Sequence, residues 1–207
     1  MKNTDYTIYP VTDREALKGC SLEDAVIHTI LGGAKIIQLR EKNMTSREFL
    51  ESAVSIKKIT EEHGVKLIIN DRVDIALAVN ADGVHLGQSD MPAEIARRIL
   101  GKDKIIGVTA PTVEMALQAE KDGADYIGVG AMFKTSTKAN TVCNTKDNLI
   151  KIVQSVNIPV VAIGGINLEN APALADTGIS GFAVVSAIFG SDDIKGATEK
   201  LISILRK

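Results

Sequence analysis

The sequence predicts an α/β fold, a (β/α)8 TIM barrel, on three observations. Short runs rich in Ile and Val recur eight times along the 207 residues, and stretches with helical spacing separate them. The runs are continuously apolar, as parallel strands buried on both faces are. Polar residues follow directly after most of the runs. Eight such units in this length approach the lower size limit of the fold, about 200 residues.

The elements are expected in strict alternation. Strands are predicted at 7–11, 35–39, 66–69, 83–86, 104–108, 125–129, 159–163 and 182–185. Thr45 and Glu48 have the spacing of a capping box and begin a helix with Phe49, Ala53 and Ile56 on its apolar face. Two later helices are expected to bury Val113, Ala116 and Leu117, and Ala197, Leu201 and Ile204.

A doubly wound open sheet is the alternative fold. Neither a GxGxxG after the first strand nor a Walker P-loop is present, which favours the barrel. No linker or low-complexity segment divides the chain, so a single domain covering 1–207 is expected. Aromatic residues make up 3% of the sequence and Trp is absent, which predicts an aliphatic core.

Composition excludes several functional classes. Lys and Arg number 24 against 26 Asp and Glu, so no strongly basic field favours nucleic acid or an anionic membrane. No apolar run reaches the roughly 18 residues of a membrane helix, and no signal peptide is recognisable. Cys20 and Cys143 lack the spacing of a disulfide framework or zinc site. A soluble, cytoplasmic protein is therefore expected.

Two carboxylates follow neighbouring strands at the end of the barrel where active sites lie. Asp71 and Asp90 are expected to converge there, as a general acid/base pair or as ligands of a hard divalent cation. Each Asp alone is also explained as a helix cap. The cationic surroundings favour the metal site, because Arg40, Lys42 and Lys138 lie on the same rim.

A second anion site is expected after the last two strands. Gly164, Gly165 and Ile166 follow the seventh strand and Ser186 follows the eighth, where many barrels bind phosphate. A tight turn alone would also need these glycines. His85 is either a base or a packing residue. Two phosphate sites of this kind predict that the protein joins or rearranges two phosphorylated small molecules.

The motifs together resemble the thiamine phosphate synthase family over essentially the whole chain. They are Gln38-Leu39-Arg40-Glu41-Lys42, Asn70-Asp71-Arg72, Gly83-Val84-His85-Leu86-Gly87-Gln88-Ser89-Asp90, Thr135-Ser136-Thr137-Lys138 and Val161-Ala162-Ile163-Gly164-Gly165-Ile166. The resemblance implies a transferase that joins 4-amino-5-hydroxymethyl-2-methylpyrimidine diphosphate to 4-methyl-5-(2-phosphoethyl)thiazole. It also implies Mg²⁺ as cofactor and loss of diphosphate before the thiazole nitrogen captures the pyrimidine methylene cation.

The resemblance assigns a role to each matching position. Asp71 and Asp90 would hold Mg²⁺, and the expected catalytic residues are Arg40, Lys42, Lys138 and Thr109. The diphosphate would be bound by Arg40, Lys42, Asn70 and Lys138, Gln38 would lie near the pyrimidine, and Thr109 is also expected to bind substrate. Contacts to the thiazole phosphate are expected from Thr135, Thr137, Gly165, Ser186, Ala187 and Ile188.

The chain departs from the family pattern at four positions. Thr109 stands where Ser is usual, and the loop after the sixth strand has Ala131 and Lys134 in place of two prolines and Asn140 in place of Asp. A less rigid lid is expected.

The alternatives are a thiazole tautomerase, which needs no diphosphate site, and a non-catalytic phosphate-ligand binder. Homo-oligomer formation and the use of Mn²⁺ are left open.

Overall fold

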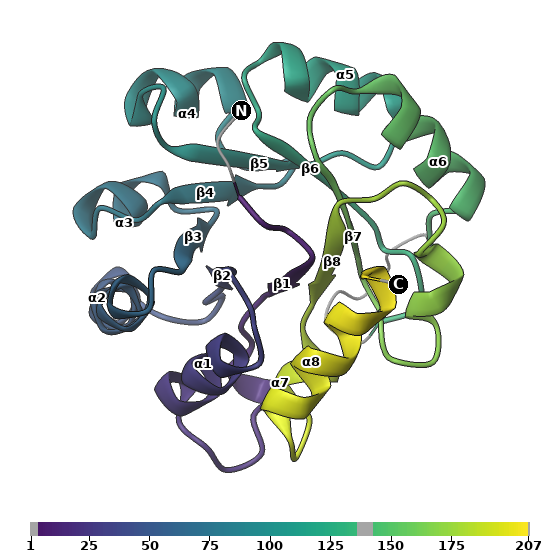
Figure 1. Cartoon of the computed structure of the whole chain (residues 1–207). Helices are drawn as coiled ribbons and strands as arrows, with labels where there is room; N and C mark the ends of the chain where they lie inside the picture. The colour runs from purple at the N-terminus through teal and green to yellow at the C-terminus, as the bar shows by residue number, and fades with distance from the viewer. Residues whose placement is uncertain (1–3, 136–142, 207) are drawn as a thin grey trace.

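The barrel predicted from the sequence is confirmed. The computed structural model describes residues 4–135 and 143–206, and its parallel strands form a ring, as Figure 1 shows. Within these residues the strands are β1 (Ile8–Pro10), β2 (Ile36–Leu39), β3 (Lys66–Asn70), β4 (Gly83–Leu86), β5 (Ile105–Thr109), β6 (Tyr126–Val129), β7 (Val160–Ile163) and β8 (Gly181–Val184).

The strand order excludes the open-sheet alternative. From β2 to β8 each strand pairs in parallel with the next along the chain, and β8 pairs with β1. A parallel bridge between Val11 and Gln38 joins β1 to β2, where the backbone N–H of Thr12 also donates to the Gln38 carbonyl at 2.9 Å. This contact brings the first and last members of the sheet together.

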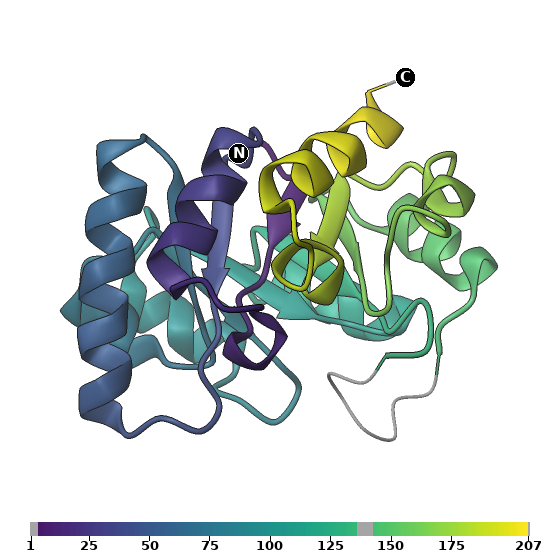
Figure 2. The same ribbon diagram turned by 90° about the horizontal axis from the view of Figure 1, so that it is seen from below.

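Helices cover the outside of the ring, as the side view in Figure 2 shows. They are η1 (Arg14–Ala16), α1 (Leu22–Leu31), α2 (Ser46–Glu62), α3 (Val73–Ala78), α4 (Ala93–Leu100), α5 (Val113–Lys121), α6 (Lys146–Ser155), η2 (Ala171–Leu174), α7 (Ser186–Phe189) and α8 (Ile194–Leu205). The capping box predicted at Thr45 and Glu48 is present at the start of α2.

Two helix predictions need correction. Helix α5 buries Ala116 and Ala119, whereas Leu117, expected in the core, is 45% exposed. The apolar face is rotated because these small alanines pack closest to the barrel. The seventh unit has no full helix between its strands. It holds only the 3-10 turn η2, with Pro172 in its first turn.

The interior of the ring forms a second core, separate from the layer between strands and helices. The layer under the helices is mainly aliphatic, as expected. The interior instead contains Tyr6, Tyr9 and Tyr126, which are all the tyrosines of the chain, packed with Ile36 and Ile68. The prediction of an aliphatic core thus describes the layer under the helices, whereas in the barrel interior the three tyrosines pack among aliphatic side chains.

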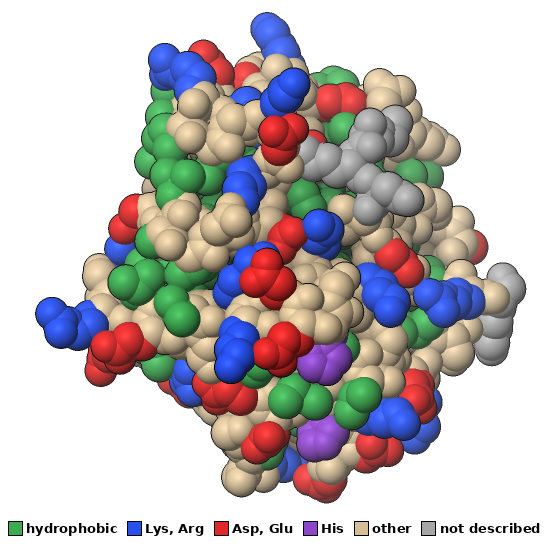
Figure 3. Space-filling model, turned by 60° about the vertical axis from the view of Figure 1, so that its left-hand side comes forward, with side chains coloured by type: hydrophobic (Ala, Val, Ile, Leu, Met, Phe, Trp, Pro, Cys, Tyr) green, Lys and Arg blue, Asp and Glu red, His purple; other side chains and the backbone are tan. Residues whose placement is uncertain are grey.

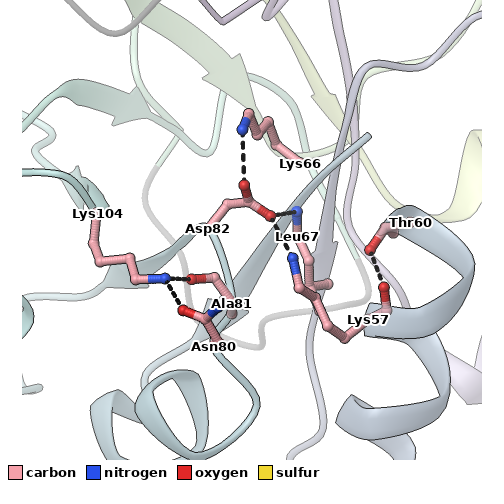
Figure 4. A network of polar contacts seen from close by, with 8 residues as sticks. All are labelled: Lys57, Thr60, Lys66, Leu67, Asn80, Ala81, Asp82 and Lys104. Carbon is pink, nitrogen blue, oxygen red and sulfur yellow. Dashed lines mark hydrogen bonds and ion pairs between the residues drawn. The ribbon is translucent and has the colours of Figure 1, made fainter. Parts of the chain in front are cut away.

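Polar contacts of Asp82 join the starts of β3 and β4, as Figure 4 shows. The Asp82 carboxylate, directly before β4, accepts from the Leu67 N–H of β3 at 3.1 Å and from Lys66 Nζ at 2.8 Å. Lys57 Nζ of α2 lies 3.3 Å from the same carboxylate. One side chain thus holds two strands and a helix in register.

Asp125 repeats the arrangement two strands further on. Its carboxylate, directly before β6, accepts from the Ile106 N–H of β5 at 2.8 Å and from Arg97 Nη2 at 2.6 Å. An acidic residue placed before a strand therefore satisfies a backbone donor of the neighbouring strand at both positions. This explains why polar residues at this end of the barrel stabilise the ring.

The outer face carries charges of both signs, as the side shown in Figure 3 illustrates, with apolar side chains in small separate groups. In the part of the chain that the structure describes, no helix is both long and apolar enough to cross a bilayer. The outside of the barrel thus gives no sign of a large apolar interaction face in this view.

We expect Asp82→Asn to lower the free energy of unfolding by about 1 to 3 kcal/mol at pH 7. Burial alone would raise the pKa of Asp82, but the hydrogen bonds from Lys66 and Leu67 and the charge of Lys57 outweigh it and lower the pKa. A lowered folded-state pKa stabilises the fold above the ordinary pKa, and this contribution is lost as the pH falls through the folded-state pKa. Urea unfolding of the variant and of the unaltered protein measures the difference in the free energy of unfolding at pH 7 and at pH 3.5.

The matched control is Asp192→Asn, because Asp192 also pairs with a lysine but its side chain is 89% exposed. We expect a change within about 0.5 kcal/mol for this variant. An Asp82→Asn penalty that is equally large at pH 3.5 would contradict the assignment to the carboxylate charge.

Candidate functional site

One cavity occupies the carboxyl ends of the strands. Its volume is about 810 Å³, and its lining comes from loops after most of the strands. Predicted site residues that line it are Gln38, Arg40, Lys42, Asn70, Asp71, Asp90, Thr109, Thr135, Gly165 and Ser186. The strand-end rule therefore brings residues from distant parts of the sequence to one place.

Two of the other predicted residues are described and are not lining residues, and two lie outside the described residues. Thr137 and Lys138 lie outside the described residues, as does the departure at Asn140. Ala187 and Ile188 lie in α7, next to the lining residue Ser186. The Ile188 side chain is fully buried, and its N–H donates to the Val185 carbonyl at 3.2 Å.

The two predicted carboxylates converge. The Asp71 and Asp90 side chains are within hydrogen-bonding reach of each other. Asp71 has a left-handed backbone, with φ of 63°, a conformation uncommon outside glycine. The Asp71 N–H donates to the His85 carbonyl at 2.8 Å, and the Gly87 N–H donates to Asp90 Oδ2 at 2.6 Å. Backbone contacts from the β4 region thus hold both acids.

The pair has unequal proton affinities. Burial alone would raise the pKa of Asp71, but the hydrogen bond from Lys42 and the contact with Asp90 outweigh it and lower that pKa. Burial and the neighbouring Asp71 charge raise the pKa of Asp90. Two acids this close disfavour full ionisation unless a cation replaces the shared proton.

These residues fit a hard divalent cation. Two facing carboxylates are the protein ligands that Mg²⁺ usually takes, and water and phosphate oxygens complete its shell. Within 4–135 and 143–206 no group of three or more His, Cys, Asp or Glu side chains is gathered. The two carboxylates leave most of the coordination shell of such an ion to water and to the phosphate oxygens of a ligand.

Asn70 supplies a donor for such a ligand. Its side chain is only 8% exposed, yet among the described residues its Nδ2 has no hydrogen-bond partner. A buried donor without a partner is costly. Because Asn70 lines the cavity beside Asp71, a ligand oxygen placed there would satisfy it.

The cations on the rim are held by acids of the chain. Lys42 Nζ donates to Asp71 Oδ2, and Arg40 Nη1 lies 3.8 Å from Asp13 Oδ2. The residue between them, Glu41, accepts from Arg14 Nε at 2.7 Å. The loop after β2 is therefore positioned by residues of η1 and its cap, which the sequence motifs did not single out.

The glycines after β7 are required by close packing. Gly164 and Gly165 have φ of 96° and 67°. A Cβ at Gly165 would lie 2.5 Å from the Lys134 carbonyl, so the loop after β6 passes directly against this turn. The tight-turn explanation of these glycines is thus supported, and the same turn lines the cavity.

His85 is also part of the cavity wall. The sequence left it as a base or a packing residue, and the structure places its ring inside the barrel, 8% exposed. Its Nε2 lies 2.9 Å from Thr109 Oγ1 and its Nδ1 lies 2.9 Å from Tyr126 Oη. Its position in an apolar strand gave no signal for these partners.

Comparison with known proteins gives consistent matches over the whole chain. A family model described as thiamine monophosphate synthase matches residues 8–188. The thiamine-phosphate synthases of Ruminiclostridium cellulolyticum and Clostridium tetani are 56% and 54% identical to the chain over 200 residues. Each alignment covers 97% of this chain, and they cover 95% and 96% of the two relatives.

Solved structures agree. The thiamine phosphate pyrophosphorylase from Pyrococcus furiosus has a TM-score of 0.89 and 43% identity, covering 98% of this chain and 96% of that one. A 3-hexulose-6-phosphate synthase structure has a TM-score of 0.67 at 16% identity, covering 96% of this chain and 99% of that one. At that identity the second match concerns the fold alone.

We expect Arg14→Met to destabilise the protein by about 1 to 3 kcal/mol at pH 7, because it leaves the Glu41 carboxylate buried without its partner. Burial already raises the pKa of Glu41, against the hydrogen bond from Arg14. Without Arg14 the pKa rises further, so the penalty grows as the pH rises above the ordinary pKa and is smaller at pH 4. Urea unfolding at both pH values measures it.

The double variant Arg14→Met, Glu41→Gln is the control, because it removes the buried charge together with its partner. We expect it to be more stable at pH 7 than Arg14→Met alone. No recovery in the double variant would show that Arg14 acts through other contacts, such as its 2.9 Å bond to Ser52 Oγ.

Proposed function

This chain belongs to the thiamine monophosphate synthase family and is a transferase that makes thiamine phosphate, and from this premise we propose its substrates and mechanism. The proposed substrates are 4-amino-5-hydroxymethyl-2-methylpyrimidine diphosphate and 4-methyl-5-(2-phosphoethyl)thiazole. The products are thiamine phosphate and diphosphate. The observation that carries the proposal is the convergence of Asp71, Asp90, Lys42 and the unsatisfied Asn70 donor in one cavity.

The first step breaks the bond between the pyrimidine methylene carbon and the diphosphate oxygen. The electron pair leaves with the diphosphate, whose negative charge must be stabilised as it develops. Arg40 and Lys42 face the cavity and Asn70 Nδ2 is available to donate to an oxygen. Lys138, outside the described residues, is proposed as a further cation for the same group.

Asp71 and Asp90 would hold Mg²⁺ at this place. When bound, the ion neutralises charge on the diphosphate oxygens as a Lewis acid. Lys42 then has two partners in reach, its present contact Asp71 and the leaving diphosphate. The residues of the chain orient the diphosphate and stabilise its charge, and no side chain needs to move a proton on carbon.

The second step forms the new carbon–nitrogen bond. The thiazole nitrogen lone pair attacks the pyrimidine methylene cation, so no oxidant and no proton donor is consumed. Gly165, Ser186 and Thr135, which line the other side of the cavity, are proposed to bind the thiazole phosphate, with Thr137 beyond the described residues. The walls at Ile163 and Ile166 are apolar and favour exclusion of competing water.

The direct test is incubation of the purified protein with both substrates, with Mg²⁺ or with EDTA, and assay of thiamine phosphate and diphosphate. Formation of both products only with the metal is expected. A folded protein that binds thiazole phosphate but yields no product would instead indicate the tautomerase or the non-catalytic binder.

We expect Asp71→Ala to lower turnover of the pyrimidine diphosphate by at least about a hundredfold, since it removes a charged ligand at the leaving group. The affinity for thiazole phosphate should change by less than about twofold, because its proposed contacts lie across the cavity. Steady-state kinetics and calorimetric binding measure the two effects.

Asp74→Ala is the matched control. Asp74 lies three residues away and pairs with Arg72, but its side chain is 65% exposed and does not line the cavity. Turnover close to that of the unaltered protein is expected. If Asp71→Ala lowered the turnover of the pyrimidine diphosphate and the affinity for thiazole phosphate by equal factors, the division of the cavity into two halves would be contradicted.

A further inference from the structure

Five side chains from five strands form one continuous line of hydrogen bonds through the barrel interior. Gln38 Nε2 donates to Tyr9 Oη at 2.9 Å, and Tyr9 Oη lies 2.8 Å from Tyr126 Oη. Tyr126 Oη lies 2.9 Å from His85 Nδ1, and His85 Nε2 lies 2.9 Å from Thr109 Oγ1. The proposed chemistry does not use either tyrosine or the histidine.

Both ends of this line reach the cavity. Gln38, His85 and Thr109 line its floor, whereas the two tyrosine rings are fully buried below it. A ligand on the floor could therefore contact Gln38, His85 or Thr109 without touching the two tyrosines. This separates the tyrosines, which can only act through other residues, from the residues that meet a substrate.

The backbone makes room for the line at two glycines. Tyr126 on β6 reaches His85 on β4 by passing over β5, where Gly107 pairs with both residues. A Cβ at Gly107 would lie 2.0 Å from the Tyr126 ring, and one at Gly128 would lie 3.1 Å from His85 Cε1. The interior is therefore shaped around these two rings.

Each hydroxyl has one hydrogen to donate, so the donor at one end fixes the direction of every bond. Tyr9 Oη accepts from Gln38, and among the described residues its other hydrogen-bond partner is Tyr126 Oη, so we assign the Tyr9 hydrogen to the bond with Tyr126. Tyr126 then donates to His85 Nδ1, and a neutral imidazole that accepts at Nδ1 carries its hydrogen on Nε2. His85 Nε2 donates to Thr109 Oγ1, which leaves the Thr109 hydrogen directed to a ligand.

We propose that Tyr9, Tyr126 and His85 are positioning residues that set Thr109 as a hydrogen-bond donor on the cavity floor and leave the Gln38 carbonyl oxygen as an acceptor. The inference rests on the proposed function, whose aminopyrimidine ring offers the Thr109 hydroxyl an acceptor ring nitrogen beside its exocyclic amine. The corresponding 4-oxo pyrimidine offers an N–H next to a carbonyl. The line of hydrogen bonds therefore selects the amino ring over the oxo ring.

The first test compares Tyr126→Phe with Tyr6→Phe. The Tyr6 ring lies in the same buried cluster, 4.9 Å from the Tyr126 ring, but its hydroxyl is not part of the line. Both variants lose one buried hydroxyl, so a merely structural role predicts similar effects. We expect the preference for the amino over the oxo diphosphate, measured as the ratio of kcat/KM, to fall about five- to tenfold only in Tyr126→Phe.

A double-mutant cycle tests whether Tyr126 changes the substrate preference through the Thr109 hydroxyl. In a Thr109→Val background the hydroxyl at the end of the line is gone, so adding Tyr126→Phe should change the preference by less than about twofold. Thr109→Ser retains the hydroxyl and should retain the preference. An unchanged preference in Tyr126→Phe, or a full further loss in the double variant, would overturn the proposal. Tyr9→Phe breaks the same line and replaces Tyr126→Phe if that variant does not fold.

The direction of the line is measured without turnover. ¹⁵N NMR of the histidine side chains, with the His85 signals identified by their loss in His85→Gln, should show the Nε2–H tautomer in the unaltered protein and a changed signal in Tyr126→Phe. The Nδ1–H tautomer would overturn the assigned direction. A protein with the Nε2–H tautomer but no product from either diphosphate would support the direction while contradicting the proposed function.

Discussion

The site depends on one geometric constraint, the alternation of inward and outward side chains in eight parallel strands that close into a ring. In β2 the inward side chain changes from Ile36 to Gln38, and in β3 it changes from Ile68 to Asn70. Two residues along a strand thus separate packed core from cavity floor. Because all strands run the same way, this transition occurs at the same end in each, and the polar residues meet there.

The positions of these residues could be predicted from the sequence, because strand periodicity and the strand-end rule require no distances. Which of these side chains would contact one another could not be predicted. Arg14 lies in η1 and Glu41 in the loop after β2, and Tyr9 and Tyr126 are joined across the ring by an interaction that leaves no pattern in either strand. The predicted buried face of α5 was wrong at Leu117 for a related reason. The packing of the small side chains Ala116 and Ala119 decided which face of the helix is buried.

The charges of the cavity are arranged before any ligand enters. Lys42 is held by Asp71 and Arg40 by Asp13, and each contact keeps a long side chain near the mouth of the barrel. The left-handed backbone at Asp71 belongs to the same arrangement, because it is an uncommon conformation held by the Asp71 N–H bond to His85. Preorganisation of this kind lowers the cost of ordering charged groups around a polyanion.

Gly107 shows how packing inside the barrel limits the order in which substitutions can occur during evolution. A side chain at that position and the Tyr126 ring cannot occupy the same volume. The two positions are thus epistatic, since a larger residue at 107 is tolerated only after the ring at 126 has become smaller. Exchange of the tyrosine for an aliphatic residue must come first, and the intermediate would contain an empty space inside the barrel.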